Sequence, residues 1–98
     1  MERIFAKRTI RSFWLEYSET EQYLKTWYDT VKSADWRSPA DVKASFASAS
    51  ILKEGRVVFN IKGNRYRLIA KINYEKQWVF IRFIGTHSEY DTIDANSI

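Results

Sequence analysis

The stretch RVVFNIKGNRYRLIAKIN, residues 56–73, decides the fold class of this chain. It contains a first run of strand-forming residues from Arg56 to Ile61 and a second from Arg65 to Asn73. Lys62-Gly63-Asn64 separates them, and two such runs joined by a short glycine-containing turn are typical of a β-hairpin. The sequence therefore predicts that a hairpin forms the centre of a sheet.

The second run has two different faces, because successive side chains of a strand point to opposite sides. The apolar and aromatic face comprises Tyr66, Leu68, Ala70 and Ile72. The opposite face carries Arg67, Ile69 and Lys71, and we expect it to be open and basic.

A third run, Gln77 to Ile84, follows after a turn around Tyr74 to Lys76 and extends the hairpin into an antiparallel meander. Upstream, Glu2 to Ala6 is long enough for a short first strand. The small-residue stretch from Phe46 to Leu52 is expected to be a loop.

Three helices are predicted between the first strand and that loop. Two have apolar residues at helical spacing, and Ser18-Glu19-Thr20-Glu21 has the form of a capping box that starts the second. Ser38-Pro39 resembles an N-cap followed by proline and opens a third helix through about Ser45. The two apolar stripes comprise Ile10, Phe13, Trp14 and Tyr17, and Leu24, Trp27, Tyr28 and Val31.

These elements predict a single α+β domain over residues 1–98, with N-terminal helices packed on one face of a mainly antiparallel sheet and a short C-terminal helix. The net charge is +4, but segment 56–87 holds seven basic residues and one acid, so the rest is slightly acidic. A basic sheet beside an acidic remainder suggests a surface for a polyanion. A solvated face with Lys and Arg at the strand edges is the alternative.

Composition excludes several classes of function. There is no cysteine and only one histidine, so disulfides and the usual zinc sites are excluded. No glycine-rich phosphate loop occurs, and no apolar run approaches the ~20 residues that a membrane span requires. The charged N-terminus lacks the apolar region of a secretory signal. We therefore expect a cytoplasmic protein without a membrane association, a metal or another cofactor.

The segment FIGTHSEYD, residues 83–91, contains the single histidine. Thr86-His87-Ser88-Glu89 has the form of a capping box, which explains Thr86 and Glu89 as the start of a short helix. It leaves His87 and Tyr90 unexplained. At the first turn of a helix, an imidazole tends to be neutral and able to accept a proton.

These residue types suffice for RNA cleavage without a metal. The ribose 2′-hydroxyl supplies the nucleophile, so the protein needs a proton acceptor, a proton donor and cations for the charge on the phosphate. Cleavage of DNA needs a much stronger nucleophile, so RNA is the preferred substrate.

Two motifs resemble the HigB-type toxins of bacterial toxin–antitoxin systems, which belong to the RelE-like superfamily. They are NIKGNRYRL, residues 60–68, and IRFIGTHSEYD, residues 81–91; the segments 36–43 and 49–52 are also similar. The resemblance implies a RelE-like fold and a ribosome-dependent endoribonuclease, an mRNA interferase that cuts translated mRNA. It also implies a HigA-type helix-turn-helix antitoxin that neutralises the toxin, and contact with operator DNA only through their complex.

The resemblance implies site residues as well. Arg67 matches the central-strand arginine that contacts the scissile phosphate. His87 matches a basic or His residue just after the last strand, and Tyr90 matches a tyrosine near the C-terminus. Lys71, on the same predicted strand face as Arg67, is a further candidate for stabilising charge. Lys62, Arg65 and Arg82 are expected to hold the RNA backbone, although turn solvation explains the first two equally well and an ion pair with Asp91 is an alternative for Arg82.

Two other functions remain open. One is a non-catalytic RelE-fold toxin that binds and poisons a topoisomerase, and the other is a plain RNA-binding module. Neither needs His87 and Tyr90 for chemistry. A plain RNA-binding module would instead expose aromatic side chains on the sheet for base stacking.

Overall fold

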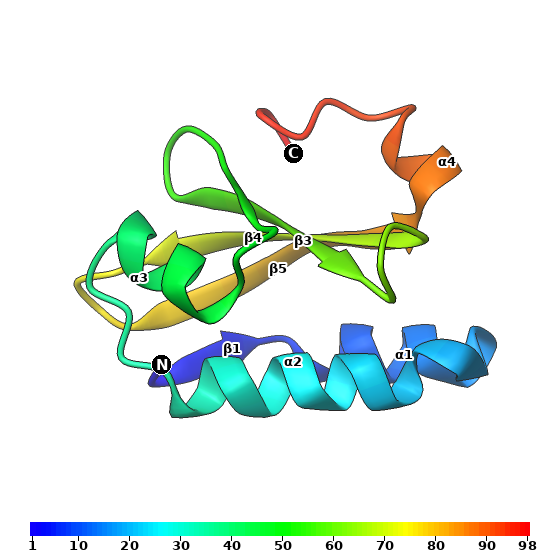
Figure 1. Ribbon diagram of the computed structural model, residues 1–98, viewed down its shortest axis with the longest axis horizontal. Coiled ribbons are helices and arrows are strands. Elements are labelled where there is room, and N and C mark those ends of the chain that lie inside the picture. The colour runs from blue at the N-terminus through cyan, green and yellow to red at the C-terminus, as the bar shows by residue number, and fades with distance from the viewer.

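The computed structural model describes residues 1–98, in which helices cover a five-stranded sheet (Figure 1). The helices are α1 (Lys7–Glu16), α2 (Glu21–Ser33), α3 (Pro39–Ser45) and α4 (His87–Tyr90), and a 3₁₀ turn, η1 (Ser18–Thr20), precedes α2. The strands are β1 (Arg3–Phe5), β2 (Ser50–Ile51), β3 (Arg56–Ile61), β4 (Tyr66–Asn73) and β5 (Trp78–Thr86).

The strand order is β1-β5-β4-β3-β2, and every neighbouring pair is antiparallel except β1 with β5. The predicted meander and the predicted α+β class are therefore confirmed. The expected loop at residues 46–52 is wrong at Ser50 and Ile51, which pair with Val58 and Val57 at the sheet edge. A strand of two residues depends on its partner in the sheet, so its own sequence carries little signal.

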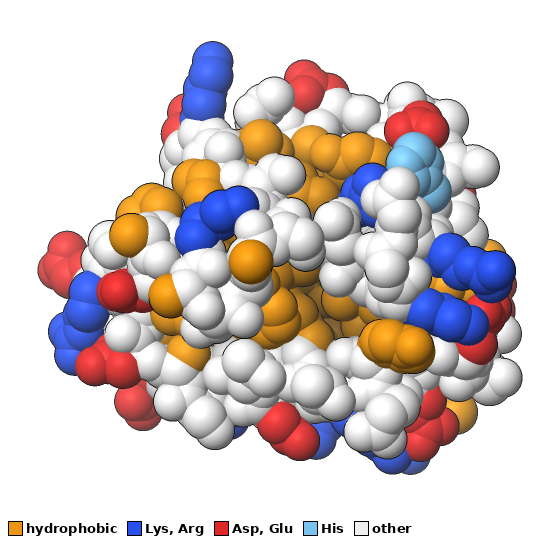
Figure 2. Space-filling model, in the orientation of Figure 1, with side chains coloured by type: hydrophobic (Ala, Val, Ile, Leu, Met, Phe, Trp, Pro, Cys, Tyr) orange, Lys and Arg blue, Asp and Glu red, His pale blue; other side chains and the backbone are white.

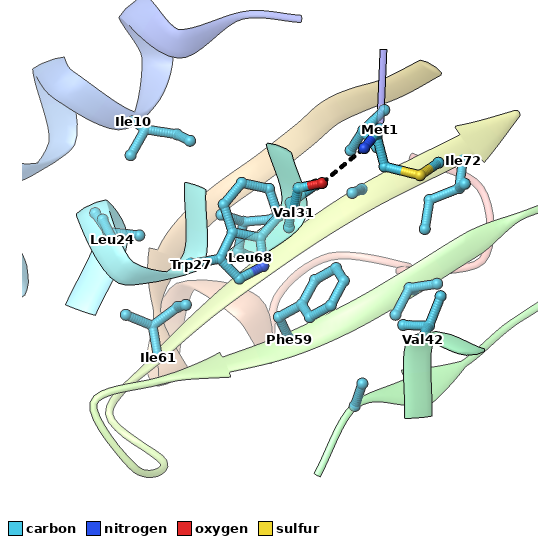
Figure 3. Packing of buried hydrophobic residues seen from close by; sticks show 14 of the residues in the cluster. Met1, Ile10, Leu24, Trp27, Val31, Val42, Phe59, Ile61, Leu68 and Ile72 are labelled. Atoms are coloured by element: carbon cyan, nitrogen blue, oxygen red, sulfur yellow. Dashed lines mark hydrogen bonds between the residues drawn. The ribbon is translucent and has the colours of Figure 1, made fainter. Parts of the chain in front are cut away.

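The core lies between the sheet and helices α1 and α2, which occupy the same side of it in Figure 1. Figure 3 shows Trp27 of α2 directed at the sheet, where its ring meets that of Phe59 edge-on at 5.4 Å. The N-terminal amine of Met1 donates to Val31 O at 2.9 Å and anchors the chain start to the end of α2. Both predicted helical stripes contribute to this core: Ile10, Phe13, Trp14, Leu24, Trp27 and Val31 are buried, and Tyr17 and Tyr28 pack against them.

The capping box predicted at residues 18–21 does not form. These residues turn as a 3₁₀ helix before α2 begins, and no side chain caps either element. The hydroxyl of Thr20 is buried and donates to Tyr17 O at 2.7 Å, and it accepts no amide hydrogen of α2. The side chain of Glu19, in the same turn, reaches the sheet instead. Helix α3 begins at Pro39 as predicted, although the Ser38 side chain makes no capping bond.

The second face of the sheet is not open over its whole area, contrary to the expectation. Val58 and Ile69 are buried there, and Figure 1 shows the C-terminal segment lying over this side of the sheet. Arg56 Nε donates to Ile98 O at 2.9 Å and holds the end of that segment. The chain end supplies the cover, which the strand pattern alone does not reveal. None of the helices has the combination of length and apolar character needed to cross a membrane.

Candidate active site

The candidate site forms where β4 begins and β5 ends. Antiparallel pairing places Arg67 opposite Gly85 and Tyr66 opposite Thr86. The backbone amide of His87 then donates to Arg65 O at 2.9 Å, which ties the first residue of α4 to the hairpin turn. The two motifs of the sequence are therefore adjacent in space because their strands are neighbours.

Helix α4 has the predicted capping box. Thr86 Oγ1 accepts from the Glu89 amide at 3.1 Å, and Glu89 Oε1 accepts from the Thr86 amide at 2.8 Å. Two backbone donors of a four-residue helix are thereby satisfied, which fixes the helix although it is short. The cap explains Thr86 and Glu89, and it leaves His87 and Tyr90 available at the surface.

The imidazole of His87 is oriented by a carboxylate. Its Nδ1 lies 3.1 Å from Asp91 Oδ2, and 42% of the side chain is exposed. When Nδ1 carries the hydrogen for this bond, Nε2 presents a lone pair to solvent. Figure 2 shows the single histidine at the surface, between an acidic side chain and a Lys or Arg side chain. This arrangement is suited to proton transfer at Nε2.

The guanidinium of Arg67 lies against the ring of Tyr90, with Cζ 5.5 Å from the ring centroid. Its Nη1 donates to Asn64 O at 3.1 Å, so one edge of the group is held by the hairpin turn. Arg67 forms no ion pair, and its charge is not neutralised by a carboxylate. Guanidinium binds phosphate through paired hydrogen bonds.

Glu19 is a site residue that the sequence did not reveal. Its carboxylate accepts from Lys62 Nζ at 2.7 Å and from Tyr66 Oη at 2.6 Å, and Arg65 Nη1 lies 3.5 Å away. The hydrogen bond from Lys62, followed by that from Tyr66, lowers the pKa of Glu19, and the hydrogen bond to Glu19 raises the pKa of Tyr66. Lys62 and Arg65, two of the residues expected to contact RNA, are thus paired with an acid. In the sequence, Glu19 looked like part of a helix cap, and no local signal marks a partner 47 positions away.

Lys71 and Arg82 lie apart from Arg67. Lys71 is four residues further along β4, about 13 Å at the rise of a strand, and pairs with Phe80. It lines a pocket of about 490 Å³ together with Arg82. Arg82 forms no ion pair with Asp91, the alternative considered for it from the sequence. The predicted residues therefore form two groups: one lies at the end of β5 around Arg67, and the other, Lys71 and Arg82, lies beside the middle and first half of β5.

The chemistry available at the site is that of His, Tyr, Arg and carboxylate side chains. The structure contains no group of three or more His, Asp or Glu residues arranged to hold a metal ion. An imidazole oriented by a carboxylate, next to a cation stacked on a tyrosine, provides acid–base groups beside an anion-binding group.

Residues 20–93 match the model of the HigB toxin family, described as the RelE-like toxic component of a toxin–antitoxin system. The mRNA interferase toxin HigB of Escherichia coli K12 is 32% identical over 82 residues, which are 82% of this chain and 79% of that protein. The mRNA interferase HigB of Shigella flexneri is equally similar, and that of Escherichia coli O6:H1 is 28% identical over 80 residues, 80% of this chain and 78% of that protein. The match and the fold together establish that this chain belongs to the HigB family of RelE-like toxins.

Proposed function

We propose that this protein is an mRNA interferase, an endoribonuclease toxin that cleaves mRNA on translating ribosomes without a metal ion. The observation that carries the proposal is the contact between the Arg67 guanidinium and the Tyr90 ring, three residues from a histidine oriented by Asp91. The names of the similar proteins support the same activity.

His87 acts as the proton acceptor in this proposal. Nε2 removes the proton of the ribose 2′-hydroxyl, and the 2′-oxygen forms a bond to phosphorus while the bond to the 5′-oxygen breaks. The products are a cyclic phosphate and a free 5′-hydroxyl once the leaving oxygen has received a proton. Asp91 holds Nδ1 at 3.1 Å and stabilises the imidazolium that forms.

Arg67 binds the scissile phosphate and offsets the negative charge that develops on it. Tyr90 keeps the guanidinium in place through its ring, and its hydroxyl is the candidate donor to the leaving oxygen. Lys71 is about 13 Å along the strand from Arg67, so in this proposal it binds a more distant phosphate of the same RNA strand.

The remaining cations guide the RNA backbone. Lys62 and Arg65 project from the hairpin turn, where Glu19 pairs with both. Arg65 stays available to phosphate because 70% of its side chain is exposed, whereas Lys62 is held more closely by Glu19 and is 29% exposed. Arg82 is exposed on β5 and carries no ion pair. Together they place positive charge on both sides of Arg67.

The partners follow from the family. A toxin of this kind is neutralised by a cognate antitoxin, for which we propose a HigA-type helix-turn-helix protein that contacts operator DNA as part of the complex. The ribosome presents the mRNA, and the protein acts in the cytoplasm.

Primer extension on a reporter mRNA tests the proposal, with purified protein in the presence and absence of translating ribosomes. Cleavage by the wild type is expected only with ribosomes and should persist when a chelator of transition metals is added that leaves the Mg²⁺ of the ribosome in place. His87→Ala and Arg67→Ala should abolish it, whereas Tyr23→Ala, an exposed aromatic on α2, should cleave like the wild type.

The alternatives give different results in the same experiment. Arrest of translation without any cut would identify a binding protein, and an effect that survives both His87→Ala and Tyr90→Ala would point to a topoisomerase or a similar target. Co-expression with the antitoxin should restore growth in the wild type. Cleavage of free RNA at the ribosome-dependent rate would contradict the ribosome requirement.

A further inference from the structure

Three aromatic side chains form a cluster on the sheet outside the core. Phe5 of β1 stacks on Phe80 of β5 with ring centroids 5.0 Å apart, and Trp78 meets both rings edge-on at 6.0 and 6.2 Å. None of the three belongs to the buried core. Phe5 is 37% exposed, and Trp78 and Phe80 are half-buried. We call Phe5, Trp78 and Phe80 the aromatic platform.

Cations surround the platform. Lys76 Nζ lies 4.8 Å from the centroid of a Trp78 ring, and Arg82 Cζ lies 5.9 Å from that of Phe80. Lys71 is the strand partner of Phe80. Two acids, Glu54 and Glu75, line the adjoining pocket with Lys71 and Arg82, and the first of these is paired with Arg56. The free charge next to the rings is therefore positive.

A β-bulge contributes to this arrangement. Between the pairs Ile69–Phe83 and Ala70–Ile81 the register of β5 shifts, and Arg82 is the extra residue. A bulge redirects side chains by inserting one residue into a strand. Arg82 consequently lies over the ring of Phe80 and beside Lys71, at the wall of a pocket of about 490 Å³.

We propose that the aromatic platform binds bases of the same mRNA strand at a distance from the scissile phosphate, with Lys71, Lys76 and Arg82 holding its backbone. Aromatic faces stack on any base, and neighbouring cations hold the phosphates, which is the chemistry of single-stranded RNA recognition. The inference rests on the proposed function, to which it adds a second RNA contact.

The spacing along β5 fits one continuous strand of RNA. Phe80 and His87 are seven residues apart with one bulge between them, which corresponds to about 20 Å at the rise of a strand. A stacked strand advances roughly 3.4 Å per nucleotide, so about six nucleotides reach from the catalytic residues to the platform. A shorter RNA engages one of the two surfaces only.

Length-dependent binding tests this proposal. The probes are fluorescent 2′-O-methyl RNA oligonucleotides of about three and about ten nucleotides, which lack the nucleophile and remain uncut. The wild type is expected to bind the longer probe more tightly. Trp78→Leu, which keeps an apolar side chain but removes the flat ring, should bind the longer probe at least about fivefold more weakly, so that the advantage of the longer probe over the shorter one is reduced.

Two controls separate binding from folding. Tyr23→Leu removes an exposed ring of α2 and should bind both probes like the wild type. The double variant Lys76→Gln, Arg82→Gln keeps all three rings, and its affinity for the longer probe should depend less steeply on salt, because fewer phosphates are neutralised. Thermal unfolding identifies any variant that fails to fold. If Trp78→Leu does not fold, the salt dependence of the double variant tests the proposal in its place.

Equal affinity of wild type and Trp78→Leu for the longer probe overturns the proposal. So does a Trp78→Leu protein that binds the probes normally but loses affinity for vacant ribosomes or for the antitoxin, since the platform would then dock ribosomal RNA or a protein. Primer extension with the wild type is recorded in parallel. A wild type that cuts no mRNA refutes the proposed function, and the oligonucleotide affinities still report on the platform.

Discussion

The hydroxyl of Tyr66 donates a hydrogen bond to Glu19 Oε1 at 2.6 Å, and so connects the first residue of β4 to the turn between α1 and α2. Lys62 donates to the other carboxylate oxygen from the far side of the hairpin turn. The same turn supplies the carbonyl oxygens that accept from Arg67 and from the His87 amide. Glu19 therefore supports the segment on which the candidate catalytic residues rest.

Tyr66→Phe removes this hydrogen bond and keeps the ring in the core. Because Tyr66 is buried and its partner is charged, we expect the free energy of unfolding to fall by about 1.5 kcal/mol. Urea unfolding at neutral pH measures the change. Tyr23→Phe, at an exposed tyrosine, is the matched control, and an equal effect of the two substitutions would contradict the role of Glu19.

The contribution of this hydrogen bond to stability is limited to a window of pH. The pKa of Glu19 is lowered from its ordinary 4.5, so its contribution is complete above that value and is lost as the pH falls through the folded-state pKa. The pKa of Tyr66 is raised above 10.0, so its contribution is complete below that value and is lost as the pH rises through the folded-state pKa.

Unfolding free energies across pH measure that window. The difference between wild type and Tyr66→Phe should be largest at neutral pH and should shrink in strong acid and in strong base. A difference that stays constant at low pH would show that the charged form of Glu19 is not the acceptor that matters.

Local patterns of sequence predicted much of this fold. The helical stripes, the hairpin at residues 62–64 and the cap at Thr86 all depend on residues close together in the chain, and each is present. The parallel pairing of β1 with β5 and the cover over Ile69 depend on contacts between distant segments, which periodicity does not encode.

The features of the candidate site can be separated in the same way, into those that follow from local sequence and those that depend on distant contacts. The approach of Arg67 to His87 and Tyr90 follows from the pairing of neighbouring strands, which the hairpin pattern implies. The separation of Lys71 follows from the length of β4. The contact of Glu19 with Tyr66 joins the turn between α1 and α2 to strand β4. It depends on the length and orientation of the two side chains, which the spacing of residues in the sequence does not reveal.

The proposed function gives the ring and the hydroxyl of Tyr90 separate roles. Tyr90→Phe keeps the ring against the Arg67 guanidinium, so we expect KM to be unchanged and any loss in kcat to report the hydroxyl. Tyr90→Leu removes the cation–π contact, worth about 1 kcal/mol at an exposed site, and should raise KM about fivefold. Steady-state cleavage on ribosomes separates the two effects, and identical kinetics for both variants would refute the assignment.

Gly85 is required for close packing at the start of α4. A Cβ at this position would lie 2.6 Å from Phe83 Cζ and 3.0 Å from Glu89 Oε1, so both side chains have to move. We expect Gly85→Ala to destabilise the protein by about 1–2 kcal/mol and to lower cleavage by disturbing the helix cap. Gly63→Ala is a contrasting control, because its Cβ meets no atom within 4 Å and only its positive φ of 65° causes strain.

The pairing of His87 with Asp91 predicts how the rate of cleavage depends on each residue. His87→Ala removes the proposed proton acceptor and should lower kcat by about 10²–10⁴-fold. Asp91→Asn keeps the size of the side chain but removes the charge that orients Nδ1 and stabilises the imidazolium, so we expect an intermediate loss of about tenfold. Single-turnover cleavage on stalled ribosomes measures both. Since Asp91 acts only through His87, Asp91→Asn should have no further effect in the His87→Ala background, and additive losses would show that the carboxylate has a separate role.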